Sequence, residues 1–309
     1  MLGTGEPKPT SNPNLTRRTL LAGGTATALA LTAGQAYAAP GARGVHARLR
    51  ELEQQHGARL GVFAYNLKTK ATARYRAAER FPMMSVFKTL AAAAVLRDLD
   101  RDGETLAKRI FYTQADLDQA QGSPETGKHL AEGMTIAELC AAAICQSDNA
   151  AGNLLLRELG GPTAVTRFCR SVGDDTTRLD RWEPDVNTCE PWRVEDTTSP
   201  VAIGRTYARL VLGNALDGPD RERVTAWLLA NTTSGERFRK GLPKDWTIAD
   251  KTGAGAYGSN NNVGIAWTQD ATPIVLAVLT TKPDPTAAPD NPLIAETAAV
   301  LAEAVSRPS

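Results

Sequence analysis

The chain has 309 residues, with 35 lysines and arginines against 34 aspartates and glutamates, and 42% of its residues are hydrophobic. This composition is typical of a soluble globular protein and excludes disorder, collagen and coiled coil. A net charge of +1 supplies neither the clustered basic face that nucleic acid requires nor a polybasic stripe for anionic lipid. We therefore expect a small-molecule partner.

The first 38 residues have the pattern of an export signal. Paired arginines at 17 and 18 precede an apolar run over residues 20–31, and an A-x-A motif follows at 36–38. The arginine pair indicates twin-arginine export, and the run is shorter than the ~20 apolar residues of a membrane anchor. We expect residues 1–38 to be a cleaved signal and residues 39–309 to form a monomeric protein that is secreted into the extracellular or periplasmic space.

Hydrophobic spacing predicts strands near both ends of the mature chain and helices between them. The predicted strands are 59–67, 71–75, 246–251, 263–268 and 274–281. The predicted helices are 45–55, 85–99, 135–146, 150–159, 163–172, 200–212, 220–230 and 295–305. Residues 135–138 have the form T-x-x-E of a capping box.

This order of elements predicts a two-lobed α/β fold. An antiparallel sheet formed by both chain ends and flanked by helices would make an α/β lobe from about 39–82 and 232–309. An inserted all-α lobe would span about 83–231. We expect the functional site in the cleft between the lobes.

The cysteine content leaves the disulfide state open. An exported protein permits disulfides, but four cysteines are too few for a disulfide scaffold; they are Cys140, Cys145, Cys169 and Cys189. The first two lie five residues apart on one predicted helix and point in different directions, so we do not expect them to pair. With three histidines and no C-x-x-C or H-E-x-x-H spacing, neither a metal nor another cofactor is expected.

Ser85 and Lys88 open a predicted helix one turn apart, on the same face. An adjacent amine can take the proton of a serine hydroxyl, and a helix N-terminus supplies N–H groups for a developing oxyanion. By itself this S-x-x-K pattern is weak, because an N-capping serine followed by a solvated lysine would look the same.

Two further short motifs have equally plain alternatives when each is taken alone. Ser147-Asp148-Asn149 lies between two predicted helices and could be a capped junction, and Lys251-Thr252-Gly253 ends a predicted strand before a turn. Their joint occurrence with S-x-x-K, in this order, makes three independent structural explanations improbable.

The three motifs together are the signature of class A β-lactamases and penicillin-binding proteins. From about Val45 to Val305 the chain resembles a class A serine β-lactamase. The stretch 181–187, Arg-Trp-Glu-Pro-Asp-Val-Asn, is similar to the omega loop of that family, and 196–200 is similar to its exit. The resemblance implies an Arg181–Asp196 ion pair that pins this loop.

The resemblance also implies a role for each motif residue. Ser85, Lys88, Ser147 and Glu183 would be catalytic, with Ser85 as nucleophile, Ser147 as proton relay to the leaving nitrogen, and Glu183 as the base for deacylation. Whether Lys88 or Glu183 deprotonates Ser85 stays open. The residues expected to contact substrate or the deacylating water are Asn149, Asn187, Lys251, Thr252, Gly253, Ala254 and Arg237. The oxyanion hole would be the backbone N–H groups of Ser85 and Ala254.

Two positions depart from the family's pattern. Where many relatives carry an arginine after the K-T-G strand, this chain has Ser259-Asn260-Asn261-Asn262, so the contact to a substrate carboxylate would fall to Arg237. A solvated arginine at a helix end is the alternative. Gly122 stands where an aromatic wall is frequent, which would widen the mouth of the cleft.

The implied activity is hydrolysis of penicillins and some cephalosporins through an ester on Ser85, conferring β-lactam resistance. Two alternatives stay open from the sequence. A D-Ala-D-Ala peptidase shares the first three motifs but has no need of a deacylating glutamate, so Glu183 with Asn187 favours the hydrolase. A catalytically silent binder of wall peptides or β-lactams would keep the fold without turnover.

Overall fold

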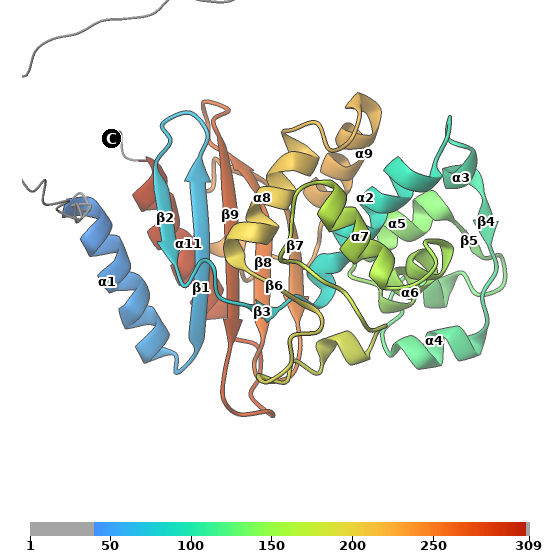
Figure 1. The fold of residues 1–309 in the computed structure, drawn as a ribbon, viewed down its shortest axis with the longest axis horizontal. Coiled ribbons are helices and arrows are strands. Elements are labelled where there is room, and N and C mark those ends of the chain that lie inside the picture. The colour runs from blue at the N-terminus through green and yellow to red at the C-terminus, as the bar shows by residue number, and fades with distance from the viewer. Residues whose placement is uncertain (1–39, 307–309) are drawn as a thin grey trace, which may run out of the picture. The chain divides into compact units, whose positions relative to one another are not determined.

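An antiparallel sheet built from both ends of the chain is the centre of the fold (Figure 1). The structure, a computed structural model, describes residues 40–306, with side chains from residue 44 onward. The strands are β1 (Arg59–Asn66), β2 (Thr72–Tyr75), β7 (Thr247–Ala254), β8 (Asn260–Trp267) and β9 (Pro273–Thr281), in the order β2-β1-β9-β8-β7. The predicted sheet is confirmed: β1 pairs with β9 over its whole length and so joins the two chain ends.

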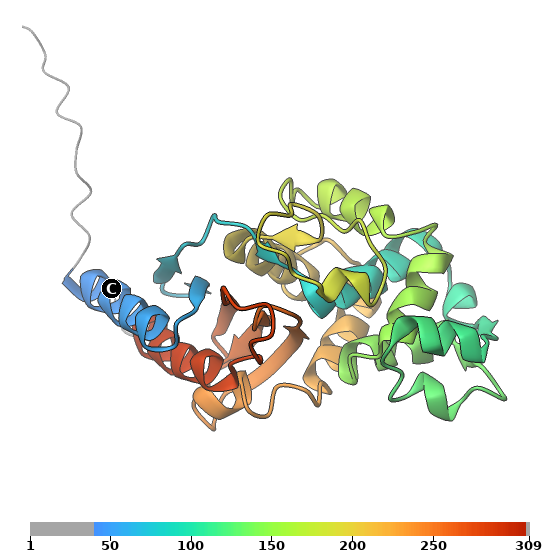
Figure 2. The same ribbon diagram turned by 90° about the horizontal axis from the view of Figure 1, so that it is seen from below.

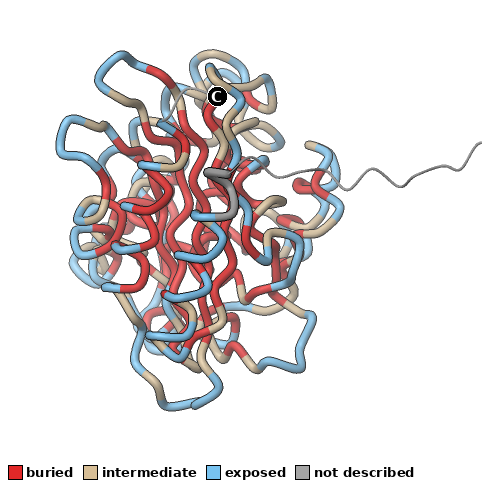
Figure 3. The backbone as a smooth tube through the Cα atoms, turned by 90° about the vertical axis from the view of Figure 1, so that its left-hand side faces the viewer, coloured by how far each residue is buried: buried red, intermediate tan, exposed pale blue. Residues whose placement is uncertain are grey.

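Both faces of this sheet are covered by helices, which explains why its central strands are nearly continuous apolar runs. Helices α1 (Pro40–Gln55) and α11 (Asn291–Ser306) lie side by side against one face (Figure 2). Helix α8 (Pro200–Val211) packs against β1, β8 and β9 on the other. The strands are accordingly among the most deeply buried segments (Figure 3).

Alternate side chains of each central strand enter two different hydrophobic cores. Val62 and Leu276 pack with residues of α1 and α11, whereas Phe63 and Val275 pack with the residues of α8 and the helical region. A shift of one residue in the β1–β9 register would exchange these sets, so the register is strongly specified.

The helical region is organised around α2 (Phe87–Ala94), every residue of which is buried. Its four consecutive alanines allow close approach of α5 (Ile136–Cys145), α6 (Asn149–Glu158), α7 (Thr163–Ser171) and α9 (Gly218–Leu229). The capping box of α5 is confirmed, since the Thr135 side chain accepts from the Glu138 N–H and the Glu138 side chain accepts from the Thr135 N–H.

Short elements complete the described chain, and the sequence patterns did not predict them. They are β3 (Phe81–Pro82) paired with β6 (Thr197–Thr198), β4 (Arg109–Ile110) paired with β5 (Met134–Thr135), and the helices α3 (Glu104–Ala107), α4 (Gln114–Ala120) and α10 (Phe238–Gly241). The 3₁₀ turns η3 (Thr126–Lys128) and η4 (Asp185–Asn187) add to them. The predicted helix 85–99 is found as three consecutive helical pieces: the 3₁₀ turn η1 (Met84–Val86), α2 and the π-helical turn η2 (Val95–Leu99).

Two details differ from the expectations. Strand β7 runs beyond Lys251 to Ala254, because β8 begins at Asn260 and the pairing Ala254↔Asn260 extends the ladder. Helix α8, expected within the all-α lobe, instead packs on the sheet. The division into lobes at about residues 83 and 231 stays a prediction.

All four cysteines are buried and free, so the described residues hold no disulfide. The expected signal at 1–38 lies outside the described residues. None of the helices between residues 40 and 306 has both the length and the apolar character needed to cross a membrane.

Candidate active site

Ser85 lies in η1, where the chain leaves β3 and enters α2. Its side chain is nearly buried, and its Oγ accepts a hydrogen bond from Nζ of Lys88 at 2.8 Å, which confirms that the two side chains of the S-x-x-K motif meet. The preceding residue, Met84, has φ of 51°, a left-handed conformation that costs about 1–3 kcal/mol outside glycine. The surrounding structure thus holds the serine in a strained turn.

The ammonium group of Lys88 is surrounded by oxygen atoms from three elements. Besides Ser85 Oγ, its Nζ lies 2.9 Å from the carbonyl of Ser147, 2.6 Å from Oδ1 of Asn149 and 3.0 Å from Oε1 of Glu183. Both Lys88 and Glu183 are fully buried. Burying a charge is tolerable only when it is paired and hydrogen-bonded, and these acceptors supply that pairing for the Lys88 side chain.

The Ser147-Asp148-Asn149 motif forms the junction between α5 and α6. Asp148 is the structural member: it caps α6 through the N–H of Ala151 and also accepts from the N–H and hydroxyl of Thr126. Ser147, at φ 60°, directs its carbonyl to Lys88 and its hydroxyl toward a second lysine. The capped-junction interpretation therefore holds for the aspartate alone.

That second lysine is Lys251, on the edge strand β7. Its Nζ donates to Ser147 Oγ and to the carbonyl of Thr252, both at 2.9 Å. Burial, which disfavours the charged form, holds the pKa of Lys251 well below the usual value for lysine, and the nearby charges of Lys88 and Arg237 lower it further. Ser147 thus bridges a lysine of the helical region and a lysine of the sheet.

Gly253 and Ala254 bring the end of β7 against the turn that carries Ser85. A Cβ at Gly253 would lie 3.1 Å from Cβ of Met84 and 3.4 Å from the backbone nitrogen of Ser85. Glycine is therefore the residue that permits this approach, and the exposed Ala254 follows at the end of the strand.

Glu183 reaches the same centre from the loop that resembles an omega loop. Its Oε1 is 3.4 Å from Ser85 Oγ, and its Oε2 accepts a hydrogen bond from Nδ2 of Asn187. The backbone of Glu183 is held on both sides by one side chain: Oδ1 of Asn153 accepts from its N–H at 2.9 Å, and Nδ2 of Asn153 donates to its carbonyl at 3.0 Å.

The sequence analysis missed Asn153 as a site residue. A signal was present, because Asn153 stands four residues after Asn149 and so lies on the same face of α6. Its partner could not be read from the sequence, since Glu183 is 30 residues away.

The predicted Arg181–Asp196 ion pair is confirmed. Nε of Arg181 contacts Oδ2 of Asp196, and Oδ1 of this almost fully buried carboxylate accepts from the N–H groups of Asp180 and Arg181. Residues 180–181 at the start of the loop are thereby tied to Asp196 at its end.

Arg237 is buried rather than solvated, so the alternative of an exposed helix-end arginine is wrong. Its Nη1 donates to the carbonyls of Gly253 and Asn261, and its Nε donates to Oδ1 of Asn291 at 2.8 Å. Burial lowers the pKa of Arg237 to about 10. The guanidinium lies directly against the K-T-G strand, and Asn291, at the start of α11, is a partner that the sequence analysis did not find.

Thr252 and Gly122 complete the set of expected residues. The hydroxyl of Thr252 is hydrogen-bonded to the hydroxyl of Thr233. Gly122 accepts the N–H of Asn149 through its carbonyl, and a Cβ there would lie 2.9 Å from Nδ2 of Asn149. Gly122, which stands where an aromatic residue was expected, therefore packs closely against Asn149 of the site.

The site contains two serine hydroxyls, two lysines and a carboxylate that are linked to one another by hydrogen bonds and close contacts. Such a set can activate a hydroxyl nucleophile and move protons to and from it. Among residues 44–306, no three or more histidine, cysteine, aspartate or glutamate side chains are grouped so that they could hold a metal ion.

Comparison with known proteins identifies the family. Residues 44–305 match the beta-lactamase enzyme family. A β-lactamase of Streptomyces lavendulae is 60% identical, with 98% of this chain and 100% of that protein aligned. The solved β-lactamase from Streptomyces albus G superposes with a TM-score of 0.84 at 62% identity, over 84% of this chain and 98% of that one. A β-lactamase structure from Streptosporangium roseum gives 0.82 at 44% identity, over 85% and 99%.

Fold and site thus define a serine hydrolase with the three-motif centre. The chain belongs to the β-lactamase enzyme family, and the resemblance to class A β-lactamases is confirmed. It is a β-lactam hydrolase, an activity that confers β-lactam resistance.

Replacing Asp196 by asparagine should destabilise the protein by about 1–3 kcal/mol, because the charge opposite Arg181 is lost while two loop N–H groups keep only a weaker acceptor. Denaturant unfolding measures the change. Asp185→Asn, at an exposed carboxylate of the same loop, is the matched control and should remain near the wild-type free energy of unfolding. Equal stability of the two variants would contradict the pinning role of Asp196.

Proposed function

We propose that the enzyme hydrolyses penicillins and some cephalosporins through an ester on Ser85, with Glu183 as the base that removes the ester. The observation that carries this proposal is the position of Glu183. One carboxylate oxygen lies within 3.4 Å of Ser85 Oγ and 3.0 Å of Lys88 Nζ, while the other is hydrogen-bonded to Asn187.

In acylation, Glu183 accepts the proton of Ser85. Glu183 is placed to do so, since its Oε1 lies 3.4 Å from Ser85 Oγ. Lys88 has further acceptors in Ser147 and Asn149 and remains an ammonium that stabilises the serine oxygen as its negative charge develops.

The substrate is held along the end of β7. The backbone N–H groups of Ser85 and Ala254 stabilise the oxyanion, and Gly253 allows the two to lie close together. The substrate carboxylate is bound by Lys251, Thr252 and Arg237. Asn149, whose Oδ1 lies 2.6 Å from Lys88 Nζ, borders the same substrate site.

Ser147 returns a proton to the leaving nitrogen. Its hydroxyl accepts from Lys251, so a proton given to the substrate can be replaced from that lysine. The proton taken from Ser85 leaves Glu183 through Lys88 Nζ, 3.0 Å away. It restores the proton that Ser147 and Lys251 gave up, so Glu183 is again a carboxylate before deacylation. The lowered pKa of Lys251 supports this relay, because its proton is more readily released than that of an ordinary lysine.

Deacylation uses a water molecule held by Glu183 and Asn187. Oδ1 of Asn187 is buried and has no hydrogen-bond partner within the described part of the chain, and a water molecule would satisfy it. Holding nucleophile and base together in this way makes ester hydrolysis effectively unimolecular. A D-Ala-D-Ala peptidase or a silent binder would have no use for this pair.

We further propose that the enzyme acts as an exported monomer without nucleic acid, after removal of residues 1–38. The support is the arginine pair and A-x-A motif of that segment and the near-neutral charge of the chain.

Glu183→Gln should lower kcat for benzylpenicillin about 10²- to 10⁴-fold and accumulate a penicilloyl adduct on Ser85, because the water is no longer deprotonated. Intact-mass spectrometry after brief incubation detects the adduct. Asp185→Asn, on the same loop but exposed, should turn over normally. An unmodified Glu183→Gln protein with normal turnover would refute the role of the glutamate.

Arg237→Ala should raise KM for benzylpenicillin by one to two orders of magnitude, or about 1–3 kcal/mol of charge-assisted binding. Steady-state kinetics measures the change. The control variant is Lys240→Ala, which removes an exposed lysine of α10 that pairs with Glu236 and so reports the general effect of losing a positive charge. If both variants keep the wild-type KM, the carboxylate is bound elsewhere.

The pH dependence of kcat/KM should report Lys251. Its pKa is lowered, so the charge that attracts the carboxylate is lost at a lower pH than for an ordinary lysine, and kcat/KM falls as pH rises through that value. In Lys251→Arg the positive charge at position 251 persists to higher pH. The fall in kcat/KM should then occur at higher pH, near the pKa of about 10 of Arg237, which is the remaining cation that loses its charge. Superimposable profiles would argue against this assignment.

A further inference from the structure

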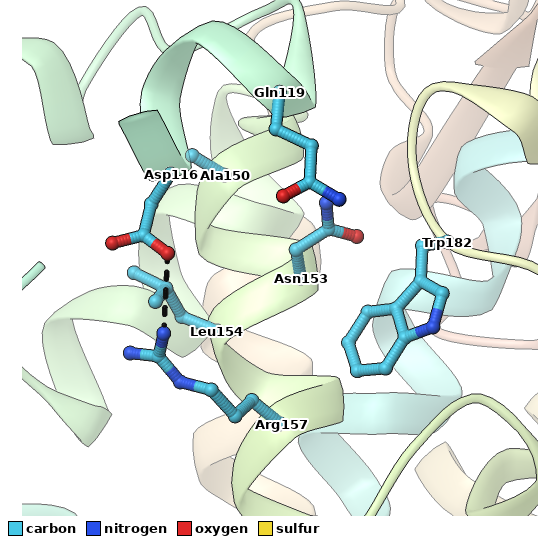
Figure 4. Close-up of a pocket in the computed structure, with 7 residues that line it drawn as sticks. All are labelled: Asp116, Gln119, Ala150, Asn153, Leu154, Arg157 and Trp182. Carbon is cyan, nitrogen blue, oxygen red and sulfur yellow. Dashed lines mark hydrogen bonds and ion pairs between the residues drawn. The ribbon is translucent and has the colours of Figure 1, made fainter. Parts of the chain in front are cut away.

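A pocket of about 260 Å³ lies beside the site, between α4, α6 and the residue that precedes Glu183 (Figure 4). Asp116 and Gln119 come from α4, Asn153 and Arg157 from α6, and Trp182 from the loop. The indole of Trp182 lies across the pocket from the two α6 residues (Figure 4). None of these five side chains has a role in the proposed reaction beyond the Asn153 contacts to the Glu183 backbone.

The charged groups of this pocket favour an anion. Arg157 and Asp116 form a pair at 3.2 Å through Nη1 and Oδ1, and Oδ2 of Asp116 accepts from the N–H and hydroxyl of Thr113. Both oxygens of the carboxylate are therefore engaged. The other N–H groups of Arg157 have no acceptor among the described residues, so a ligand finds free donors but little free acceptor capacity.

The neutral groups favour a flat aromatic ring. The side chain of Trp182 is 37% exposed, and large aromatic side chains usually bury more of their surface. Leu154 supplies an apolar contact on the α6 side, and the amide of the exposed Gln119 makes no hydrogen bond to any described residue. A ring can thus stack on the indole while a polar substituent reaches Gln119 or Arg157.

Asn153 does not compete for such a ligand. Both atoms of its amide are used by the Glu183 backbone, at 2.9 and 3.0 Å. A molecule in the pocket would therefore touch the side chain that holds Glu183 without displacing its hydrogen bonds.

We propose that this pocket is a second ligand site, separate from the reaction centre, that binds small aromatic carboxylates, with the carboxylate on Arg157 and the ring on Trp182. The volume is slightly below the roughly 300–1,000 Å³ of drug-sized ligand sites, which restricts the occupant to about one ring with a short acidic arm.

The test is a ¹⁹F NMR titration of the whole enzyme with 4-fluorophenylacetate. A ligand of this size should bind with Kd on the order of 1 mM. 4-Fluorophenylacetamide, which has the same shape without the charge, should bind about tenfold more weakly, because the charge-assisted contact to Arg157 is lost. This comparison needs no variant and is independent of catalysis.

Three variants then locate the site. Arg157→Gln should weaken binding of the carboxylate about tenfold, whereas Arg167→Gln, at an exposed arginine of α7, should leave it unchanged. Arg237→Gln should also leave it unchanged, since that arginine lies at the reaction centre. Absence of binding at 10-fold above the expected Kd, equal affinity for the amide, or loss of binding in Arg237→Gln but not in Arg157→Gln would each overturn the proposal.

Discussion

The buried contact between Lys88 and Glu183 is the constraint on which the site depends. Two fully buried, opposite charges meet at 3.0 Å, and removing either would leave an uncompensated charge inside the protein, at a cost of about 3–5 kcal/mol. The lysine comes from the most deeply packed helix of the helical region and the glutamate from a surface loop. Their attraction therefore couples the position of that loop to the core. Because the same carboxylate oxygen also reaches Ser85, the contact that satisfies the buried charges also places the Glu183 carboxylate beside the Ser85 hydroxyl.

The remaining restraints all act on the freedom of that loop. Asp196 joins its two ends through Arg181 and two backbone N–H groups, and Asn153 holds the N–H and carbonyl of Glu183 itself. A carboxylate on a loop that moved freely would be in position for only part of the time, and each misplaced ångström costs rate. The loop is thus fixed by side chains from other elements rather than by regular secondary structure of its own.

A second series of contacts, from Lys251 through Ser147 and Lys88, connects the sheet to Ser85. Lys251 and Arg237 are both buried at strand β7, and their proximity to each other and to Lys88 concentrates three basic groups around one strand end. Burial lowers the pKa of Lys251 and Arg237, because desolvation disfavours their charged forms, and at Lys251 this makes the proton easier to release. The asparagines at 260–262 are buried: Asn261 accepts from Arg237 through its carbonyl, and Asn260 shares the Asn291 amide oxygen with Arg237.

Sequence alone determined the elements whose signals are local. The strands at both chain ends, the α5 capping box and the meeting of Ser85 with Lys88 follow from periodicity and from spacing within one helical turn, and Glu183 and Arg181 followed from the resemblance of their loop. Only the tertiary structure decided that Asn153 holds Glu183, that Arg237 is buried against Asn291, and that α8 packs on the sheet. These contacts join residues 30 or more positions apart or depend on which face of a helix finds a partner. Such choices are made by packing of the whole chain, and no local pattern of side chains contains them.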